Sequence, residues 1–79
     1  MEISKYDNAF SRIFHVSPDE AKRLEYQKFP TWDSVGHMQL MQELEETFGI
    51  FLEPEDVVSF SSYEKGIEIL KKYSIVFDD

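Results

Sequence analysis

The stretch PTWDSVGHMQL, residues 30–40, sets two helix-capping residue types side by side, Asp33 and Ser34. Either side chain can accept a hydrogen bond from the free amides at a helix start, and one cap is enough. If Asp33 caps the helix, the Ser34 hydroxyl can project into solvent at the positive end of the helix dipole, where an attached anionic group would be stabilised. Ser34 is therefore a candidate attachment site; the alternative is that it is simply the second residue of a helix start.

A different chemistry would use Ser34 as a nucleophile with His37, which lies three residues further on and within reach on a helix. His37 falls on the core-facing side of that helix, however, and no Gly-rich oxyanion loop or strand–turn–helix elbow accompanies the serine. We therefore expect a packed histidine, no catalytic residue and no enzymatic activity. No metal site is expected either, because the chain has no cysteine, His15 and His37 match no zinc spacing, and LEPEDVV lacks the ligand order of a calcium loop.

The composition limits the kind of protein in which such a site must be built. The chain has 79 residues, 42% of them hydrophobic and 15% aromatic, which is enough apolar material for one compact core. We predict a single domain spanning residues 1–79. The N-terminus lacks the basic and apolar pattern of a signal peptide, and the longest nearly apolar stretch, FGIFL, is far too short to span a membrane, so we expect a cytoplasmic monomer.

Acidic charge is concentrated in the middle of the chain. None of the 8 basic residues lies between Phe29 and Glu64, and the acidic residues of that window carry the whole formal net charge of -8. Such a window repels nucleic acid and anionic lipid, and it attracts basic protein surfaces. The alternative interpretation is a solvated acidic face that keeps the domain soluble.

The spacing of apolar residues predicts helices, and no strand pattern competes with them. Three- and four-residue steps predict a first amphipathic helix through Ile3, Tyr6, Phe10, Ile13 and Phe14. A capping box from Ser17 to Glu20, with Pro18 at the first helical position, predicts a further turn to about Leu24. This turn lies in a long connection, which is typical of a functional loop.

The second main helix is predicted to begin at Asp33 or Ser34 and to end at Gly49, and a short helix to begin at Pro54. The aromatic residues of the preceding loop are expected to fill the end of the molecule beneath it: Tyr26, Phe29 and Trp32.

The last helix is predicted to open with a capping box, Ser61 to Glu64, and to pair Glu68 with Lys72. Its buried residues are expected to be Tyr63, Ile67 and Leu70. Together the segments predict an all-α fold: an antiparallel helical bundle of three main helices plus one short helix, with a long loop between the first two main helices.

On the helix after Asp33, the side chains divide between two faces. A helical wheel places one set toward the core: His37, Leu40, Met41, Leu44 and Phe48. The outer set has an apolar end near Ser34 and an acidic body: Val35, Met38, Gln39, Gln42, Glu45 and Glu46. Exposed apolar residues beside an exposed serine, above glutamates, predict a docking face.

The segment DSVGHMQLMQELEETFGI resembles the signature of acyl carrier proteins, in which Asp-Ser-Leu precedes an amphipathic helix that ends in acidic residues, Phe and Gly. LEPEDVVSFSSYEKGIEIL is similar to the family's short third helix and its fourth, so the resemblance covers residues 3–73. It implies a stand-alone, non-catalytic carrier that holds an acyl cargo as a thioester on a 4′-phosphopantetheine arm, with Ser34 as the attachment residue and Asp33 supporting it. The family's partner-binding face corresponds to Val35, Met38, Gln39, Glu45 and Glu46.

The resemblance also implies partners: a phosphopantetheinyl transferase, a loading ligase, and acyltransferase or synthase enzymes with basic docking surfaces. Two departures leave the pathway open among lipid, polyketide and polysaccharide biosynthesis. Gly36 and Gln39 stand where fatty-acid carriers are often acidic, and they resemble D-alanyl carrier proteins; Trp32 with Gly36-His37 resembles stand-alone carriers of specialised or surface-polysaccharide pathways. A D-alanyl or aminoacyl carrier, or an unmodified acidic helical adaptor that docks basic partners, are the alternatives.

Two glycines bear on how a cargo would be housed. Gly36 costs about 1 kcal/mol of helix propensity relative to alanine, and we interpret it as leaving the approach to Ser34 uncrowded. Gly66 is expected on the inward side of the last helix, where it either leaves space for an apolar cargo or allows two elements to pack closely. Sheltering such a cargo is worth about 0.8 kcal/mol per CH₂ group, and Met38 and Met41 would adapt to irregular gaps.

Overall fold

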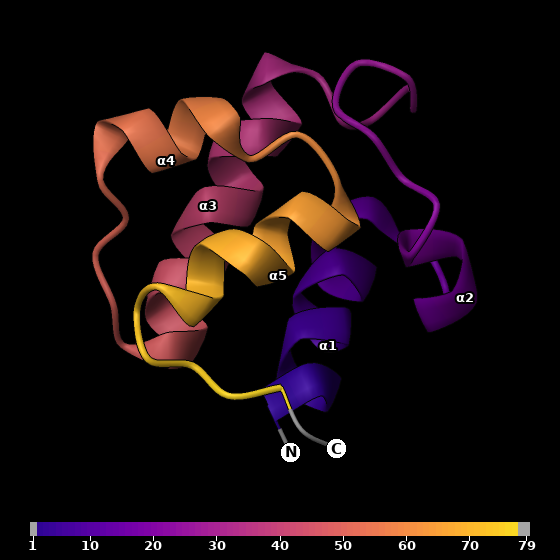
Figure 1. The fold of residues 1–79 in the computed structure, drawn as a ribbon. Helices are drawn as coiled ribbons and strands as arrows, with labels where there is room; N and C mark the ends of the chain where they lie inside the picture. The colour runs from indigo at the N-terminus through magenta and orange to yellow at the C-terminus, as the bar shows by residue number, and fades with distance from the viewer. Residues whose placement is uncertain (1, 78–79) are drawn as a thin grey trace.

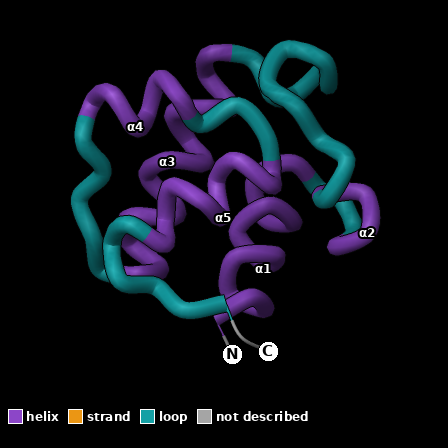
Figure 2. The backbone as a smooth tube through the Cα atoms, viewed as in Figure 1, coloured by secondary structure: helices purple, strands orange, loops and turns teal. Residues whose placement is uncertain are grey.

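All the regular structure in the described residues, 2–77, is helical. The computed structural model contains five helices in this range: α1 (Glu2–Phe14), α2 (Pro18–Ala21), α3 (Ser34–Phe48), α4 (Pro54–Ser59) and α5 (Tyr63–Lys71) (Figure 1). Loops join them without a strand between residues 2 and 77 (Figure 2). An isolated bridge pairs Glu25 with Ser62. The predicted all-α class is confirmed. None of the five helices is long and apolar enough to cross a membrane.

The helix boundaries follow from the capping residues. α2 begins with the predicted capping box, in which the Glu20 amide donates to Ser17 Oγ at 3.2 Å and the Ser17 amide donates to Glu20 Oε1 at 3.0 Å. α3 ends at Gly49, whose φ of 64° lies in the left-handed region that glycine adopts without strain. α4 begins at Pro54, where the missing amide costs no helical hydrogen bond.

The predicted start of α5 is one residue too early. Ser62 caps this helix, and its hydroxyl accepts from the Lys65 amide at 3.0 Å. Ser62 is held extended, with φ −161° and ψ 169°, next to a backbone bond from the Tyr26 amide to the Ser61 carbonyl. Because Lys65 then takes the third helical position, the expected box between Ser61 and Glu64 does not form.

The core draws its largest side chains from the three longer helices and two loops. The largest fully buried residues are Trp32, Tyr6, Phe10, Phe60, Leu40, Met41, Leu44 and Leu70. The predicted inner face of α3 is confirmed, with Phe48 half-buried at its end. α5 differs at one turn, since Ile69 is buried and Ile67 is half-buried. The prediction for α5 therefore holds at Tyr63 and Leu70 but missed Ile69.

The long connection between α1 and α3 is fastened to the rest of the chain. The Tyr26 amide donates to the Ser61 carbonyl at 2.9 Å, and the Gln27 amide donates to the Trp32 carbonyl at 2.9 Å. As predicted, the aromatic residues of this loop lie against the core, with Trp32 buried and Tyr26 and Phe29 half-buried. The chain therefore enters α3 along a fixed path.

Candidate functional site

Ser34 is the first residue of α3, and Asp33 caps the helix. Asp33 Oδ1 accepts from the Gly36 amide at 2.9 Å, and the Asp33 carbonyl accepts from the His37 amide at 2.8 Å. Ser34 is exposed. Its hydroxyl is therefore not needed to satisfy the start of α3, and it faces solvent at the end of the helix where amide hydrogens point outward.

The structure gives a reason for glycine at position 36 that differs from the predicted one. It is buried, and a Cβ atom there would collide with the Thr31 carbonyl oxygen and lie 3.1 Å from Phe14 Cε1. The Thr31 oxygen is a backbone atom, so it cannot move aside as the end of a flexible side chain could. Gly36 therefore lets the segment before Ser34 fold closely over the first turn of α3, rather than clearing an approach to Ser34.

His37 is a packed histidine with both ring nitrogens engaged. It is 8% exposed, Trp32 Nε1 donates to its Nδ1 at 2.9 Å, and its Nε2 lies 2.7 Å from the Val57 carbonyl oxygen. An indole N–H can only donate and a carbonyl can only accept. These partners fix a neutral imidazole with the proton on Nε2. His37 therefore has no free nitrogen with which to activate Ser34.

An apolar groove opens beside Ser34, between α3 and α4. It has a volume of about 1020 Å³ and is lined by Ser34, Val35, Met38, Gln39, Met41, Gln42, Glu45, Phe51, Leu52, Pro54, Val57 and Val58. Four of its apolar side chains are largely exposed to solvent, with exposed fractions of 67% for Val35, 57% for Met38, 81% for Phe51 and 83% for Val58. Exposed apolar side chains that gather in this way are typical of an interaction site.

Sequence reasoning predicted one wall of this groove and missed the other. Of the residues predicted for the docking face, Val35, Met38, Gln39 and Glu45 line the groove from α3, whereas Glu46 does not line it. The facing wall contains Phe51 and Val58, which were not predicted. Adjacent valines on a short helix cannot both face the core, so the exposure of Val58 could have been foreseen; nothing local indicates that of Phe51.

The glutamates of α3, two of which were predicted for the docking face (Glu45 and Glu46), are not equivalent. Glu45 is half-buried, and its Oε2 accepts from the Leu52 amide at 2.8 Å, so it fastens the loop after α3. Glu43 pairs with Arg12 of α1 at 3.0 Å. Glu46 is exposed. Of these three carboxylates, that of Glu46 is the most exposed, and it lines a separate hollow together with Arg12 and His15.

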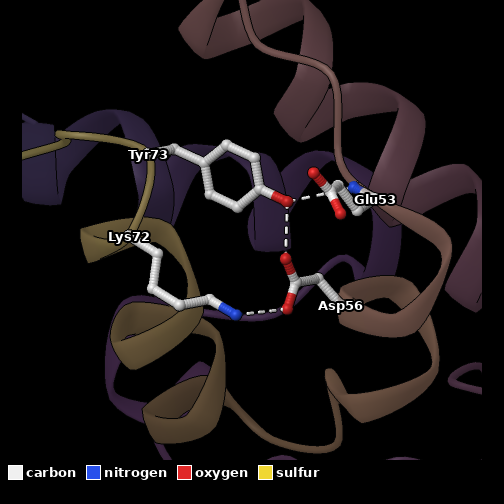
Figure 3. A network of polar contacts seen from close by, with 4 residues as sticks. All are labelled: Glu53, Asp56, Lys72 and Tyr73. Carbon is white, nitrogen blue, oxygen red and sulfur yellow. Dashed lines mark hydrogen bonds and ion pairs between the residues drawn. The ribbon is translucent and has the colours of Figure 1, made fainter.

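A polar network joins the start of α4 to the chain just after α5 (Figure 3). The Asp56 carboxylate accepts from Lys72 Nζ and from the Tyr73 hydroxyl, both at 2.6 Å, and the Glu53 amide donates to the Tyr73 hydroxyl oxygen at 3.0 Å. The predicted pair of Lys72 with Glu68 is therefore wrong, because Asp56 offers Lys72 a less exposed partner. The Lys72 ammonium, followed by the Tyr73 hydroxyl, lowers the pKa of the Asp56 carboxyl.

Gly66 does not leave space in the core. It is buried, and a Cβ atom there would collide with the Phe60 ring and the Tyr6 hydroxyl. That hydroxyl is held in place because it donates to the Tyr63 carbonyl at 2.6 Å. The expected cavity beside Gly66 is therefore wrong, and the alternative of close packing is correct. The space near the methionines lies instead in the groove that Met38 and Met41 line.

No family model, curated protein or solved structure matches this chain. Within residues 2–77, no three histidine, cysteine, aspartate or glutamate side chains are grouped so that they could hold a metal ion.

Proposed function

We propose that this chain is a carrier protein whose Ser34 receives a 4′-phosphopantetheine arm from coenzyme A. The observation that carries the proposal is the division of roles at the start of α3, where Asp33 caps the helix and Ser34 presents an exposed hydroxyl beside an apolar groove. The resemblance of DSVGHMQLMQELEETFGI to the acyl carrier signature points to the same serine. In this proposal the helices form the antiparallel bundle of that family, as a cytoplasmic monomer.

The attachment would transfer the phosphate that carries the arm from coenzyme A to the serine. The Ser34 oxygen forms a bond to that phosphorus, the pyrophosphate bond of coenzyme A breaks, and adenosine 3′,5′-bisphosphate leaves. The hydroxyl proton passes to a base of the transferase, since both ring nitrogens of His37 are engaged. The arm supplies the thiol for a thioester, in a chain that has no cysteine.

The surroundings of Ser34 suit a phosphodiester. α3 is 15 residues long and has no acidic side chain in its first turn, so its N-terminal amides present positive partial charge to the Ser34 oxygen. Asp33 opposes this field, but its Oδ1 is already held by the Gly36 amide. The residues present therefore fit a covalently attached anionic group.

The groove and the exposed end of α3 would form the docking surface. Val35, Met38 and Gln39 would make the short-range contacts, with Glu46, and Glu45 to a lesser extent, attracting basic residues of the partner. The partners proposed are the transferase that attaches the arm, a ligase that loads an acyl or aminoacyl group, and the acyltransferase or synthase that accepts it.

The decisive experiment is transfer of the arm in vitro. The protein is incubated with coenzyme A, magnesium and a broad-range phosphopantetheinyl transferase, and its intact mass is measured. One arm should be added to the wild type and to Ser59→Ala, which changes an exposed serine on α4, and none to Ser34→Ala. An unmodified wild type, or an equal addition to Ser34→Ala, would contradict the proposal and favour the unmodified acidic adaptor.

The docking surface can be tested by reversing one charge. Glu46→Lys should slow arm transfer and weaken its dependence on salt, because steering charges act mainly on the association rate and are screened by ions. Glu64→Lys makes the same charge change at an exposed position of α5. Equal rates for the two variants at low salt would place the docking surface elsewhere.

The class of cargo follows from a series of loaded forms. An apolar chain on the arm could lie along the groove, and each CH₂ group removed from water there would stabilise the folded state by at most about 0.8 kcal/mol. The melting temperature should then rise with acyl length up to a limit. If it does not change with length, an aminoacyl or other polar cargo is favoured.

A further inference from the structure

We propose that His37 is a positioning residue that holds two separate parts of the site: through Nδ1 it holds the segment that presents Ser34, and through Nε2 it holds α4 as a wall of the groove. The effect on Ser34 rests on the proposed function, whereas the effect on α4 does not. The proposal stands on two hydrogen bonds that link three parts of the chain, namely Trp32 before α3, His37 in α3 and Val57 in α4.

The bond at Nδ1 fixes the path of the chain into Ser34. Trp32 lies two residues before Ser34 and is fully buried, with its ring stacked on Phe14 at 5.3 Å between centroids and near-parallel to His37 at 6.2 Å and 18°. Stacking alone would let the indole slide within its plane. The hydrogen bond to His37 Nδ1 removes that freedom, and with it the freedom of the backbone that leads to Asp33 and Ser34.

The bond at Nε2 holds a helix that has few other anchors. α4 is 6 residues long, and the residue that it buries is Asp56, whose polar partners lie after α5. Val57 lines the groove and is half-buried, and its carbonyl accepts the His37 proton. This bond therefore connects the α4 wall directly to α3, one helical turn from Ser34.

Making both bonds at once requires the neutral imidazole, because Nδ1 must accept from Trp32 while Nε2 donates to Val57. A second proton, on Nδ1, would face the Trp32 N–H, so two donors would oppose each other. The rings around His37 are those of Tyr26, Trp32 and Phe60, and the Tyr26 phenol is the titratable group among them. The carboxylates nearest in the chain are engaged elsewhere, Asp33 by the Gly36 amide and Asp56 by Lys72 and Tyr73. The hydrogen-bonding partners of the ring are therefore the Trp32 N–H and the Val57 carbonyl.

Two substitutions can separate the two bonds. An asparagine oxygen reaches the place of the histidine Nδ1, and a glutamine amide reaches the place of Nε2. His37→Asn should keep the acceptor for Trp32 and lose the donor to Val57, and His37→Gln should do the reverse. We expect His37→Gln to slow arm transfer to Ser34 several-fold, whereas His37→Asn should transfer at close to the wild-type rate and show several-fold faster hydrogen exchange at the α4 amides.

The single tryptophan makes the Nδ1 bond directly observable. Trp32 is the one Trp in the chain, and His37 and His15 are its two histidines. At one fixed, neutral pH, Trp32 fluorescence should stay close to that of the wild type in His37→Asn and in His15→Asn, and it should differ in His37→Gln, which lacks the acceptor at Nδ1. His15 is exposed at the end of α1, so it serves as the matched control.

The outcomes distinguish this inference from the proposed function. If Ser34 accepts no arm in any variant, the carrier proposal fails, and the fluorescence and exchange measurements still decide whether His37 positions Trp32 and α4. Equal transfer rates and equal α4 exchange in His37→Asn and His37→Gln would overturn the separate roles. Wild-type Trp32 fluorescence in His37→Gln would overturn the role of the Nδ1 bond in positioning Trp32.

Discussion

α1 and α4 pack on the same core but are held by different kinds of contact. α1 buries Tyr6, Ala9, Phe10 and Phe14, and the Phe10 ring meets Trp32 at 5.6 Å and Tyr63 at 5.4 Å between centroids. α4 is held through polar atoms, namely the Asp56 carboxylate at one side and the Val57 carbonyl at the other, with buried Phe60 just after its end.

This difference indicates which part of the molecule can move without unfolding the rest. Apolar burial is proportional to the area removed from water, so a long helix that buries several large side chains can leave the core only at a large cost in free energy. A few directional hydrogen bonds on a short helix can open together, because local openings need far less free energy than global unfolding. α1 therefore belongs to the fixed core, and α4 is the groove wall whose position can change.

The largest loss of stability is expected from a substitution in α1. Phe10→Ala removes a fully buried aromatic ring and should lower the free energy of unfolding by about 3–5 kcal/mol, as measured by urea denaturation. Domains are stable by only about 5–15 kcal/mol, so this variant should be close to unfolding. Val57→Ala is the comparison on α4, where a half-buried side chain is shortened. A loss at Val57 as large as that at Phe10 would break the distinction between the helices.

A smaller and local loss of stability is expected when the contacts of Asp56 with Lys72 and Tyr73, here called the α4 latch, are weakened. Asp56→Asn keeps the shape of the side chain but removes the charge that Lys72 and Tyr73 hold. The α4 amides should exchange with solvent several-fold faster, while those of α1 and α3 keep their protection. Glu55→Gln is the matched control, because it removes an exposed charge from the same helix. Faster exchange throughout the molecule would show that the latch supports the whole core and not α4 alone.

The pH dependence of this latch has a definite sign. Lys72, and then Tyr73, lower the pKa of Asp56 in the folded state, so the folded value lies below the unfolded one of about 3.9. The stabilisation is therefore fully present above the unfolded pKa, and it is lost as the pH falls through the folded pKa. The difference in melting temperature between the wild type and Asp56→Asn should be constant near neutral pH and disappear in strong acid. A difference that persists in strong acid would exclude the charge as its origin.

The difference between local apolar patterns and polar contacts with distant residues also explains what could be predicted from the sequence and what could not. Caps and faces depend on neighbours a few residues away, which is why the end of α3 at Gly49 and its inner face were predicted correctly, and why its start was narrowed to Asp33 or Ser34. The partners of His37, Asp56 and Lys72 lie on other elements or beyond the reach of helical periodicity. The one-residue error at Ser62 has the same cause, since a bond from the long connection sets that boundary.

The smallest effect on stability is expected from the exposed residues of the groove wall. Phe51 and Val58 are 81% and 83% exposed to solvent. Phe51→Ser or Val58→Ser should therefore change the free energy of unfolding by no more than about 0.5 kcal/mol. The same substitutions remove apolar surface that a partner or an apolar cargo would cover, so they should reduce the rise in melting temperature with acyl length, as should Met38→Ser on the facing wall. Ser61→Ala, at an exposed position outside the groove, should leave that rise unchanged. If Phe51→Ser instead destabilised the unloaded protein as much as Phe10→Ala, the region around α4 would have to be counted with the fixed core, and the groove would be a consequence of packing rather than a surface available for binding.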